Sequence, residues 1–309
     1  MDAYVGIDVS KDRLDVHILP QDEAFNVERN SKGLAALVER LKPLAPSLVA
    51  IEATGGFETT AAAAVAAAGL PLAVINPVQI RHYARALGKR AKTDPIDAYV
   101  IARFAADVKP EARALPDEMT QFLADLVARR RQIVEMLQAE RQREKRATVR
   151  RLKKSLARLI GALEKELNEL ESDIDDAVRG SPVWREKEDL LISVPGVDTK
   201  TARTLLAELP ELGTLDRKRI ASLAGLAPYT RKSGRWCGKA MIGGGRKVVR
   251  TALFPAAMAA IRWNPLLKAF RDRLVADGKA KMVALIAVAR KLLIILNAIL
   301  RDKKPWQIA

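Results

Sequence analysis

Short apolar runs alternate with stretches of helical periodicity along the N-terminal third of the chain. The apolar runs predict strands near 3–8, 13–19, 24–28, 48–53 and 71–76, and a helix is expected near 32–43. Two hairpin-like strands precede that helix, so the sheet is expected to be mixed. The pattern therefore predicts an α/β domain, which we place at residues 1–112.

A long charged helical run follows, between about Asp117 and Arg179. Within it, apolar residues recur at steps of three and four, which is the a/d pattern of a coiled coil. These residues are Leu152, Leu156, Leu159, Leu163, Leu167, Leu170 and Ile174. We expect a coiled-coil linker at 113–180 that joins copies of the chain into a homo-oligomer, a dimer or a tetramer.

A second globular unit, mostly α-helical, is expected at 181–309. Leu190 to Val197, followed by a helical stretch to Leu209, predicts a helix, a tight hairpin and a second helix. Such a hairpin can present backbone N–H groups to a phosphate, and an ordinary helical turn explains the string equally well. The closing apolar stretch, Met282 to Leu300, is interrupted by Arg290, Lys291 and Asn297, so no membrane span is expected.

The net charge of the chain indicates that the protein binds a polyanion. The chain has 53 Lys and Arg against 37 Asp and Glu, a net charge of +16 and a pI near 10.0. Nucleic acid is the leading partner and a membrane surface the rival. Residues 217–271 contain 13 Lys or Arg and no acid, and residues 129–165 contain 13 basic residues against 4 acidic ones. The second cluster fits a solvated face and a nucleic-acid contact equally well.

Metal chemistry, if present, must use oxygen ligands. The chain has one cysteine, Cys237, and two histidines, His17 and His82, too few for a disulfide framework or an ordinary Cys/His zinc site. A soluble, cytoplasmic protein is expected, since no signal-peptide pattern opens the sequence.

Four acidic residues have the placement that a two-metal nuclease needs. Asp8 and Glu52 each close an apolar run, and Asp94 and Asp97 open a helix with i, i+3 spacing. Carboxylates of this kind hold Mg²⁺, and a pair of metal ions can clamp both oxygens of a phosphodiester. Taken singly, Asp8 also suits a turn, Asp94 an N-cap before Pro95, and Asp97 the helix dipole.

A candidate nucleophile lies in the glycine-rich loop predicted at 229–245. Ser233 is surrounded there by cations, which favour a deprotonated hydroxyl and bind the phosphate it attacks. A plain polar loop residue is the alternative. The candidate nucleic-acid contacts of this region are Arg231, Lys232, Arg235, Lys239, Arg246, Lys247 and Arg250.

Six segments together carry a family resemblance. They are Gly6 to Lys11, Ile51 to Gly56, Lys92 to Ala98, Leu223 to Pro228, Ser233-Gly234, and Gly244 to Arg250. In this order they resemble the DEDD transposases of bacterial insertion sequences, the group related to the pilin-gene invertase and now called bridge-RNA-guided recombinases. The chain departs from many relatives in having three glycines, Gly243 to Gly245, before Arg246.

The resemblance implies a fold and a mechanism. It implies an RNase H-like, resolvase-like N-terminal domain whose acidic tetrad, Asp8, Glu52, Asp94 and Asp97, binds Mg²⁺. It also implies that Ser233 attacks DNA to form a 5′-phosphoserine link, within active sites assembled from different protomers. A structured noncoding RNA would pair with the DNA and choose the sequence.

Two other functions remain compatible with the residues alone. One is a structure-selective junction endonuclease that uses water as the nucleophile, with Ser233 in a structural role. The other is a non-enzymatic, basic coiled-coil protein that binds nucleic acid, in which the acids only cap helices and pair with cations.

Overall fold

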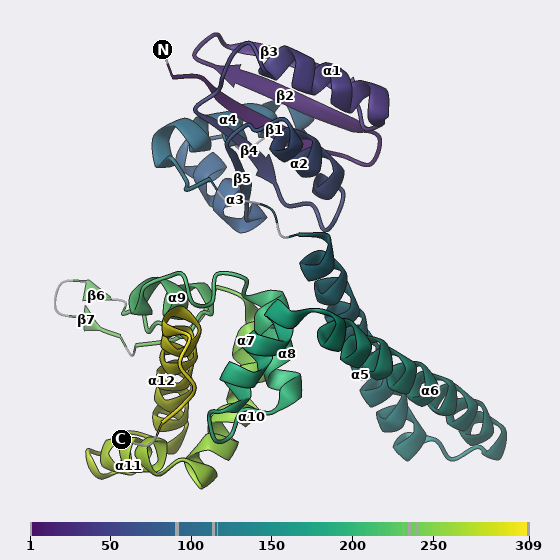
Figure 1. Cartoon of the computed structure of the whole chain (residues 1–309), viewed down its shortest axis with the longest axis vertical. Helices are drawn as coiled ribbons and strands as arrows, with labels where there is room; N and C mark the ends of the chain where they lie inside the picture. Colours follow the sequence, from purple (N-terminus) through teal and green to yellow (C-terminus); the bar gives the residue numbers. More distant parts are fainter. Residues whose placement is uncertain are drawn as a thin grey trace. The chain divides into compact units, whose positions relative to one another are not determined.

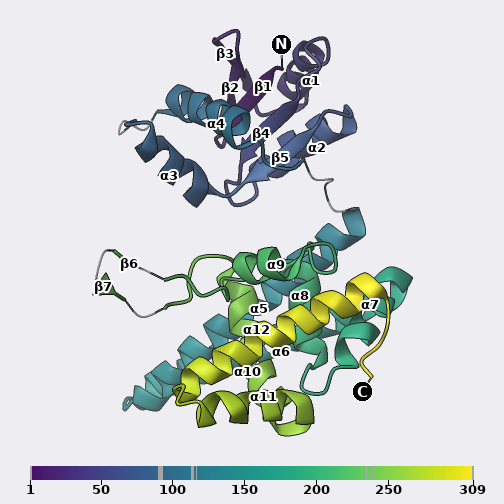
Figure 2. The same cartoon turned by 90° about the vertical axis from the view of Figure 1, so that its left-hand side faces the viewer.

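The computed structural model describes residues 2–89, 93–112, 115, 117–230, 232–233, 236–238 and 240–307. The chain folds into two compact units, Met1–Leu115 and Pro116–Ala309, and Figures 1 and 2 show the elements of each. The division into three domains expected from the sequence stays a prediction.

The N-terminal unit is built on a mixed sheet. Its strands are β1 (Tyr4–Val9), β2 (Arg13–Leu19), β3 (Glu23–Glu28), β4 (Leu48–Glu52) and β5 (Leu72–Ile75). Within the described residues their order is β3-β2-β1-β4-β5, with β1, β2 and β3 antiparallel and β4 and β5 parallel to β1. The predicted α/β unit is confirmed, and its topology is consistent with the RNase H-like fold.

Helices cover both faces of this sheet (Figure 1). Helices α1 (Ser31–Leu41) and α2 (Glu58–Ala67) pack on one face, where Leu37, Leu41 and Val65 join a core with Ile7. Helices α3 (Pro77–Ala86) and α4 (Asp94–Val108) pack on the other face, around Ala50 and Ile101. Because β1 and β4 are covered on both sides, they read as nearly continuous apolar runs.

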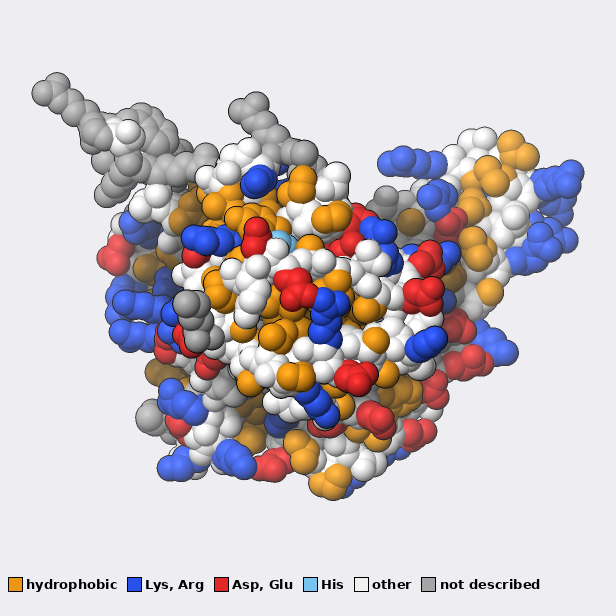
Figure 3. Space-filling view, turned by 90° about the horizontal axis from the view of Figure 1, so that it is seen from above, with side chains coloured by type: hydrophobic (Ala, Val, Ile, Leu, Met, Phe, Trp, Pro, Cys, Tyr) orange, Lys and Arg blue, Asp and Glu red, His pale blue; other side chains and the backbone are white. Residues whose placement is uncertain are grey.

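The C-terminal unit begins with a helical hairpin of α5 (Glu118–Arg146) and α6 (Arg150–Gly180). The two helices run antiparallel, since Arg130 pairs with Glu171 and Arg141 with Glu164. The predicted a/d seam of α6 packs on α5 of the same chain, and Leu152 and Leu159 at its N-terminal end stay exposed. A coiled coil between chains is therefore not confirmed. Lys and Arg side chains gather at the far end of this arm (Figure 3).

The rest of this unit is a helical bundle around its last helix. Its helices are α7 (Pro182–Ile192), α8 (Thr199–Glu208), α9 (Arg217–Leu223), α10 (Lys247–Trp263), α11 (Pro265–Ala276) and α12 (Lys281–Asp302).

Among the described helices, α12 alone has the length and composition of a membrane span. In the fold it is a core helix, because Leu292, Leu293 and Leu296 are fully buried within the bundle. Its buried Asn297 accepts a hydrogen bond from the Gly213 N–H and donates one to the Leu215 carbonyl, both 2.8 Å long. A polar side chain satisfied in this way ties the loop before α9 to the core helix.

Candidate active site

Asp8 and Glu52 lie side by side at the ends of two neighbouring strands. Strands β1 and β4 are parallel, and their register pairs Ile7 with Ile51, one residue before each acid. Residues in register point to the same face of a sheet, so both carboxylates lie on the face that carries Gly6 and α4. Both acids are half-buried.

Helix α4 lies along the same face and runs antiparallel to β1. A Cβ atom added to Gly6 would lie 2.2 Å from the Ala102 nitrogen and 2.3 Å from the Ala98 oxygen, so the helix backbone rests directly on this glycine. Just beyond the other end of α4, the Lys109 Nζ lies 6.0 Å from the centre of the Tyr4 ring. The first turn of α4 therefore lies at the Asp8 end of β1.

That first turn carries Asp94 and Asp97. Thr93 is the N-cap residue and its side chain makes no capping hydrogen bond, while Pro95 occupies the first turn. Asp94 is thus helical and not the N-cap, so the capping explanation for this residue is wrong. We call Asp8, Glu52, Asp94 and Asp97 the acidic edge; three elements bring them to one end of the sheet.

Two residues beside the acidic edge were missed by the sequence analysis. Arg13 donates from Nε to Asp15, at 2.9 Å, and from Nη2 to Asp94, at 3.2 Å. Asp15 is buried and is the cross-strand partner of Asp8. The sequence pattern that could have revealed them is the alternation along β2. Arg13, Asp15 and His17 occupy every second position of this strand and therefore share one face of the sheet.

A third missed residue shapes the loop that follows Glu52. Glu58, at the start of α2, accepts hydrogen bonds from the backbone N–H groups of Thr54 (3.1 Å) and Gly56 (2.7 Å). Burial raises the pKa of the Glu58 carboxyl, but hydrogen bonds from the backbone N–H groups of Glu58 itself, Gly56 and Thr54 outweigh it, and the pKa lies below its ordinary value. A charged Glu58 therefore holds the loop beside the acidic edge.

The acidic edge is not a preformed metal site. Within the described part of the chain, no three Asp, Glu, His or Cys side chains are arranged to hold one metal ion. Asp8, Glu52 and Asp97 each already have an interaction partner, and Asp94 pairs with Arg13. The donors are nevertheless all carboxylate oxygens, which suit a hard divalent cation.

Ser233 lies on a small β-hairpin in the C-terminal unit. Strands β6 (Lys232–Ser233) and β7 (Trp236–Cys237) are antiparallel, and Ser233 is the partner of Trp236. The loop predicted here is thus partly a strand pair, which we call the serine hairpin (Figure 2). Ser233 is exposed. Outside these two strands, Tyr229 and Met241 exchange two backbone hydrogen bonds of 2.9 and 3.0 Å, which join the segments that lead into and out of the serine hairpin.

The serine hairpin is rooted where two glycine segments cross. Gly225 has φ +69° and a Cβ there would lie 2.3 Å from the Gly244 oxygen; Gly245 has φ +59° and its Cβ would lie 2.4 Å from the Gly225 nitrogen. We call the contact of Gly225 with Gly244 and Gly245 the glycine crossing. Only glycine tolerates both the left-handed backbone and this close approach. Leu223 to Pro228 and Gly244 to Arg250, two of the six segments that carry the family resemblance, therefore pack on each other.

Two of the predicted nucleic-acid contacts support this crossing. Arg246 forms a bidentate ion pair with the buried Glu211, at 2.5 and 2.7 Å, and also donates to the Glu208 carbonyl. Arg250 donates to the Gly244 carbonyl at 2.8 Å. Both guanidinium groups thus have a structural role that the sequence did not reveal.

The other predicted contacts are placed only in part. Lys247 is exposed at the start of α10, and for Lys232 the backbone alone is described. Arg231, Arg235 and Lys239 lie outside the described residues, as does Lys92 of the segment before α4. Nucleic-acid contact by this set stays a prediction.

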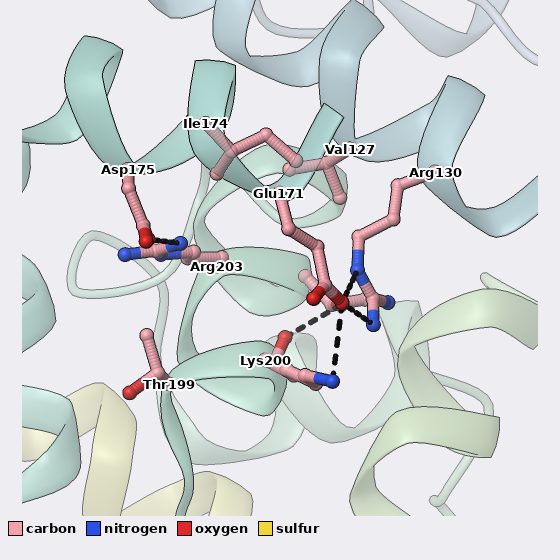
Figure 4. Close-up of a pocket in the computed structure, with 9 residues that line it drawn as sticks. Val127, Arg130, Glu171, Ile174, Asp175, Thr199, Lys200 and Arg203 are labelled. Carbon is pink, nitrogen blue, oxygen red and sulfur yellow. Dashed lines mark hydrogen bonds and ion pairs between the residues drawn. The ribbon is translucent and has the colours of Figure 1, made fainter. Parts of the chain in front are cut away.

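The helix-hairpin-helix segment forms a turn between α7 and α8, and phosphate binding by this segment stays a prediction. Asp198 accepts a 2.8 Å hydrogen bond from the Thr201 N–H, so a carboxylate already occupies the N-terminus of α8. Beside it, α5, α6 and α8 line a cavity of about 270 Å³ (Figure 4). Glu171 in this cavity pairs with Arg130 and Lys200, and Asp175 with Arg203. The charges of the cavity compensate one another, which favours a structural junction over a phosphate site.

A mixed sheet with carboxylates gathered at one end, in a strongly basic chain, defines the class: an enzyme that acts on nucleic acid. Residues 5–160 match the model of the DEDD transposases of the IS110 type, and residues 188–272 match that of the IS116/IS110/IS902 transposases. The chain belongs to this transposase family. It is therefore an enzyme of DNA cleavage and recombination.

Similar proteins agree with this assignment. The chain is 29% identical to the pilin gene-inverting protein of Moraxella bovis, over 98% of this chain and 97% of that protein. The corresponding protein of Moraxella lacunata is equally similar. A protein of the insertion element IS110 from Streptomyces coelicolor is 34% identical over 48% of this chain and 36% of its own length.

Proposed function

We propose that this transposase cuts and exchanges DNA strands with Ser233 as the nucleophile and with Mg²⁺ bound at the acidic edge. The observation that carries the proposal is the register that sets Asp8 beside Glu52, under the first turn of α4. Four carboxylates at one end of a sheet are costly in a protein unless they bind cations.

The acidic edge suits Mg²⁺ by its chemistry. Asp8, Glu52, Asp94 and Asp97 would hold the ion, which when bound polarises the phosphodiester and stabilises the charge that develops on it. Arg13 forms ion pairs with both Asp94 and Asp15. A metal ion held by Asp94 would compete with this guanidinium for the carboxylate.

The chemical step belongs to Ser233. Its Oγ forms a bond to the phosphorus while the bond from phosphorus to the 3′-oxygen breaks, which leaves a 5′-phosphoserine link and a free 3′-hydroxyl. The serine proton leaves as the bond forms and the 3′-oxygen gains one. Reversal of this step on a second DNA strand rejoins the backbone without an external energy source. The exposed serine hairpin fits this role because a DNA strand can reach it.

Partners and assembly follow from the same proposal. DNA is the substrate, and the acid-free region at 217–271 supplies cations for its phosphates. A structured noncoding RNA guides the enzyme by base pairing, as the family resemblance implies. We also propose a homo-oligomer, a dimer or a tetramer, so that acidic edge and serine of different protomers meet. The enzyme works in the bacterial cytoplasm.

Trapping of the covalent intermediate tests the proposal. The protein is incubated with Mg²⁺ and DNA carrying the ends of its own element, denatured, and examined for protein attached to DNA. Ser233→Ala is expected to abolish the adduct and retain DNA binding. Thr230→Ala removes an exposed hydroxyl three residues away and serves as the matched control, with the adduct retained.

The water-dependent endonuclease is the rival. It predicts cleaved DNA without any adduct, and cleavage that survives Ser233→Ala. That result would overturn the assignment of Ser233 and leave the acidic edge as the complete site. The non-enzymatic alternative is not supported, because the chain belongs to a transposase family.

A further inference from the structure

The end of the helical hairpin carries an unusual concentration of positive charge. We call residues 145–158, from the last turn of α5 to the first turns of α6, the hairpin tip. It contains seven exposed cations: Lys145, Arg146, Arg150, Arg151, Lys153, Lys154 and Arg158. The sequence has no Asp or Glu from 145 to 163. Figure 3 shows Lys and Arg side chains at the end of the arm, with hydrophobic side chains beside them.

Most other cations of the hairpin have acidic partners, and Arg129 is an exception that donates to the Gln132 side chain instead. Arg130 pairs with Glu171, Arg131 with Glu208, Arg141 with Glu164 and Arg143 with Glu140. In the described structure, none of the seven tip cations forms such a pair. The positive charge of the hairpin tip is therefore not balanced by acidic side chains of the described structure.

Helix energetics also argue against a structural role for the tip cations at the start of α6, whereas Lys145 and Arg146 lie in the last turn of α5, where the helix dipole favours them. A helix N-terminus has a partial positive charge, and a cation there is unfavourable by roughly 0.3–1 kcal/mol at an exposed site. Helix α6 places Arg150, Arg151, Lys153 and Lys154 in its first turns and has no acid in its first turn. Its acids instead lie towards the C-terminus, the opposite of what the helix dipole favours. These four cations therefore do not stabilise α6 through the helix dipole.

The chemistry of the tip selects the partner. The antiparallel hairpin sets the basic end of α5 beside the basic start of α6, so the cations of both helices gather at one end, with the exposed Val149 and Leu152 among them. The sequence contains no aromatic residue between Phe122 and Trp184, so the tip offers no platform on which unpaired bases can stack. Lys and Arg without aromatic residues bind the phosphate backbone and do not read bases.

We propose that the hairpin tip binds the phosphate backbone of a nucleic-acid double helix. This surface lies outside the acidic edge and the serine hairpin and requires neither metal nor the nucleophile. A second copy of the chain is the competing occupant, since α6 also carries acids near its C-terminal end. Several of those acids, Glu164, Glu171 and Asp175, already have partners within the chain, which favours the double helix.

The test uses the full-length chain and a four-site tip variant: Arg150→Gln, Arg151→Gln, Lys153→Gln and Lys154→Gln. Binding to a DNA duplex and to an RNA duplex of matched sequence is titrated with salt, in EDTA, so that no strand chemistry contributes. The control variant removes four exposed lysines scattered over the same unit, Lys165→Gln, Lys187→Gln, Lys279→Gln and Lys304→Gln. Both variants lower the net charge by four.

The tip variant is expected to bind at least one of the two duplexes about tenfold or more weakly near 100 mM salt. The slope of log K against log salt is expected to fall by about one for each phosphate that the variant leaves unneutralised, and much less in the control. A weakened affinity for DNA alone, RNA alone or both supports the proposal and identifies the duplex. Unchanged binding to both duplexes overturns it, and so does an equal weakening in the control.

Two further measurements separate the remaining outcomes. Thermal unfolding of the tip variant is expected at an equal or higher temperature than in the wild type, because unfavourable charges leave the start of α6. A clearly lower unfolding temperature in the tip variant would show that these cations stabilise the fold, and would overturn the inference that they serve a partner. Sedimentation of the free protein then tests the second copy: dissociation of an oligomer, with duplex binding unchanged, would assign the tip to protein contact.

Discussion

The acidic edge and the serine hairpin present their functional groups in different ways. The acidic edge takes its side chains from β1, β4 and α4, elements that pack on one another across the N-terminal unit. Ser233 is exposed and lies on β6, one of two paired strands of two residues each. The glycine crossing next to the serine hairpin is tightly packed. The acidic edge lies on closely packed elements, and the serine hairpin is connected to a closely packed glycine crossing.

The difference suggests a division of labour between the two sites. Carboxylates that bind a metal ion have to be held close together against their mutual repulsion, which a sheet and a helix packed on glycine can do. A nucleophile that enters a DNA strand has to project from the surface. The comparison predicts that the acidic edge is sensitive to any single change, and the serine hairpin mainly to changes at Ser233 and at its root.

The largest effect is expected for Asp97→Asn. The change keeps the size of the side chain and removes one charge at the acidic edge, and we expect Mg²⁺-dependent strand exchange to fall by about a hundredfold or more. Asp107→Asn, on the same helix, is the control and should retain activity within about twofold. Normal activity in Asp97→Asn would reduce Asp97 to a residue that favours the helix dipole.

A strong effect on stability is expected for Gly225→Ala at the glycine crossing. Left-handed strain and overlap with the Gly244 carbonyl together should cost about 3 kcal/mol. Gly244→Ala has a similar φ of +64° with open space around its Cβ position, and should cost only about 1 kcal/mol. Tryptophan fluorescence in denaturant measures both, because all four tryptophans lie in the C-terminal unit. Equal costs would show that the crossing adds nothing beyond backbone strain.

A smaller effect is expected for Arg13→Ala, which removes the cation that pairs with Asp94. Because the guanidinium and a metal ion compete for the same carboxylate, Mn²⁺ as a probe should bind several-fold more tightly to the variant. Calorimetric titration measures the affinity, and Arg103→Ala, which removes a cation further along α4, is the control. Weaker binding in Arg13→Ala would show instead that Arg13 orders the acids for the metal.

The smallest effect is expected for Glu171→Gln in the cavity between α5, α6 and α8. Burial raises the pKa of the Glu171 carboxyl, but Arg130 and Lys200 outweigh it and the pKa lies below the ordinary 4.5. The charged form therefore stabilises the fold above pH 4.5, and this contribution is lost as the pH falls through the lowered pKa.

In the Glu171→Gln variant, the free energy of unfolding of the C-terminal unit should depend less on pH below about 4.5. The difference from the wild type should be less than about 1 kcal/mol, because Glu171 and its partners are partly exposed. Glu166→Gln, an exposed acid on the same helix, is the control. A pH profile identical to that of the wild type would exclude Glu171 as a contributor.

Much of the N-terminal fold was predictable because its strands and helices have clear periodicity. The expected strand at 13–19 matches β2, and the i, i+3 spacing correctly placed Asp94 and Asp97 in one helical turn. Arg13 and Asp15 were missed because their importance depends on which strand lies next to β1. Arg246 was predicted to contact nucleic acid, and its buried partner Glu211 lies 35 residues earlier, beyond the reach of any local pattern.

The chain's periodicity, charge and motif order were enough to identify an α/β unit, a basic helical remainder and a transposase resemblance, since these properties are local or additive along the sequence. Only the tertiary structure shows which elements pack on one another and which surfaces stay exposed. It packed the leucine seam of α6 on α5 within one chain, buried the apolar α12 in a helical bundle, and left the cations of the hairpin tip without acids. Such choices depend on contacts between residues far apart in sequence, where burial and charge compensation are settled only when the elements pack together.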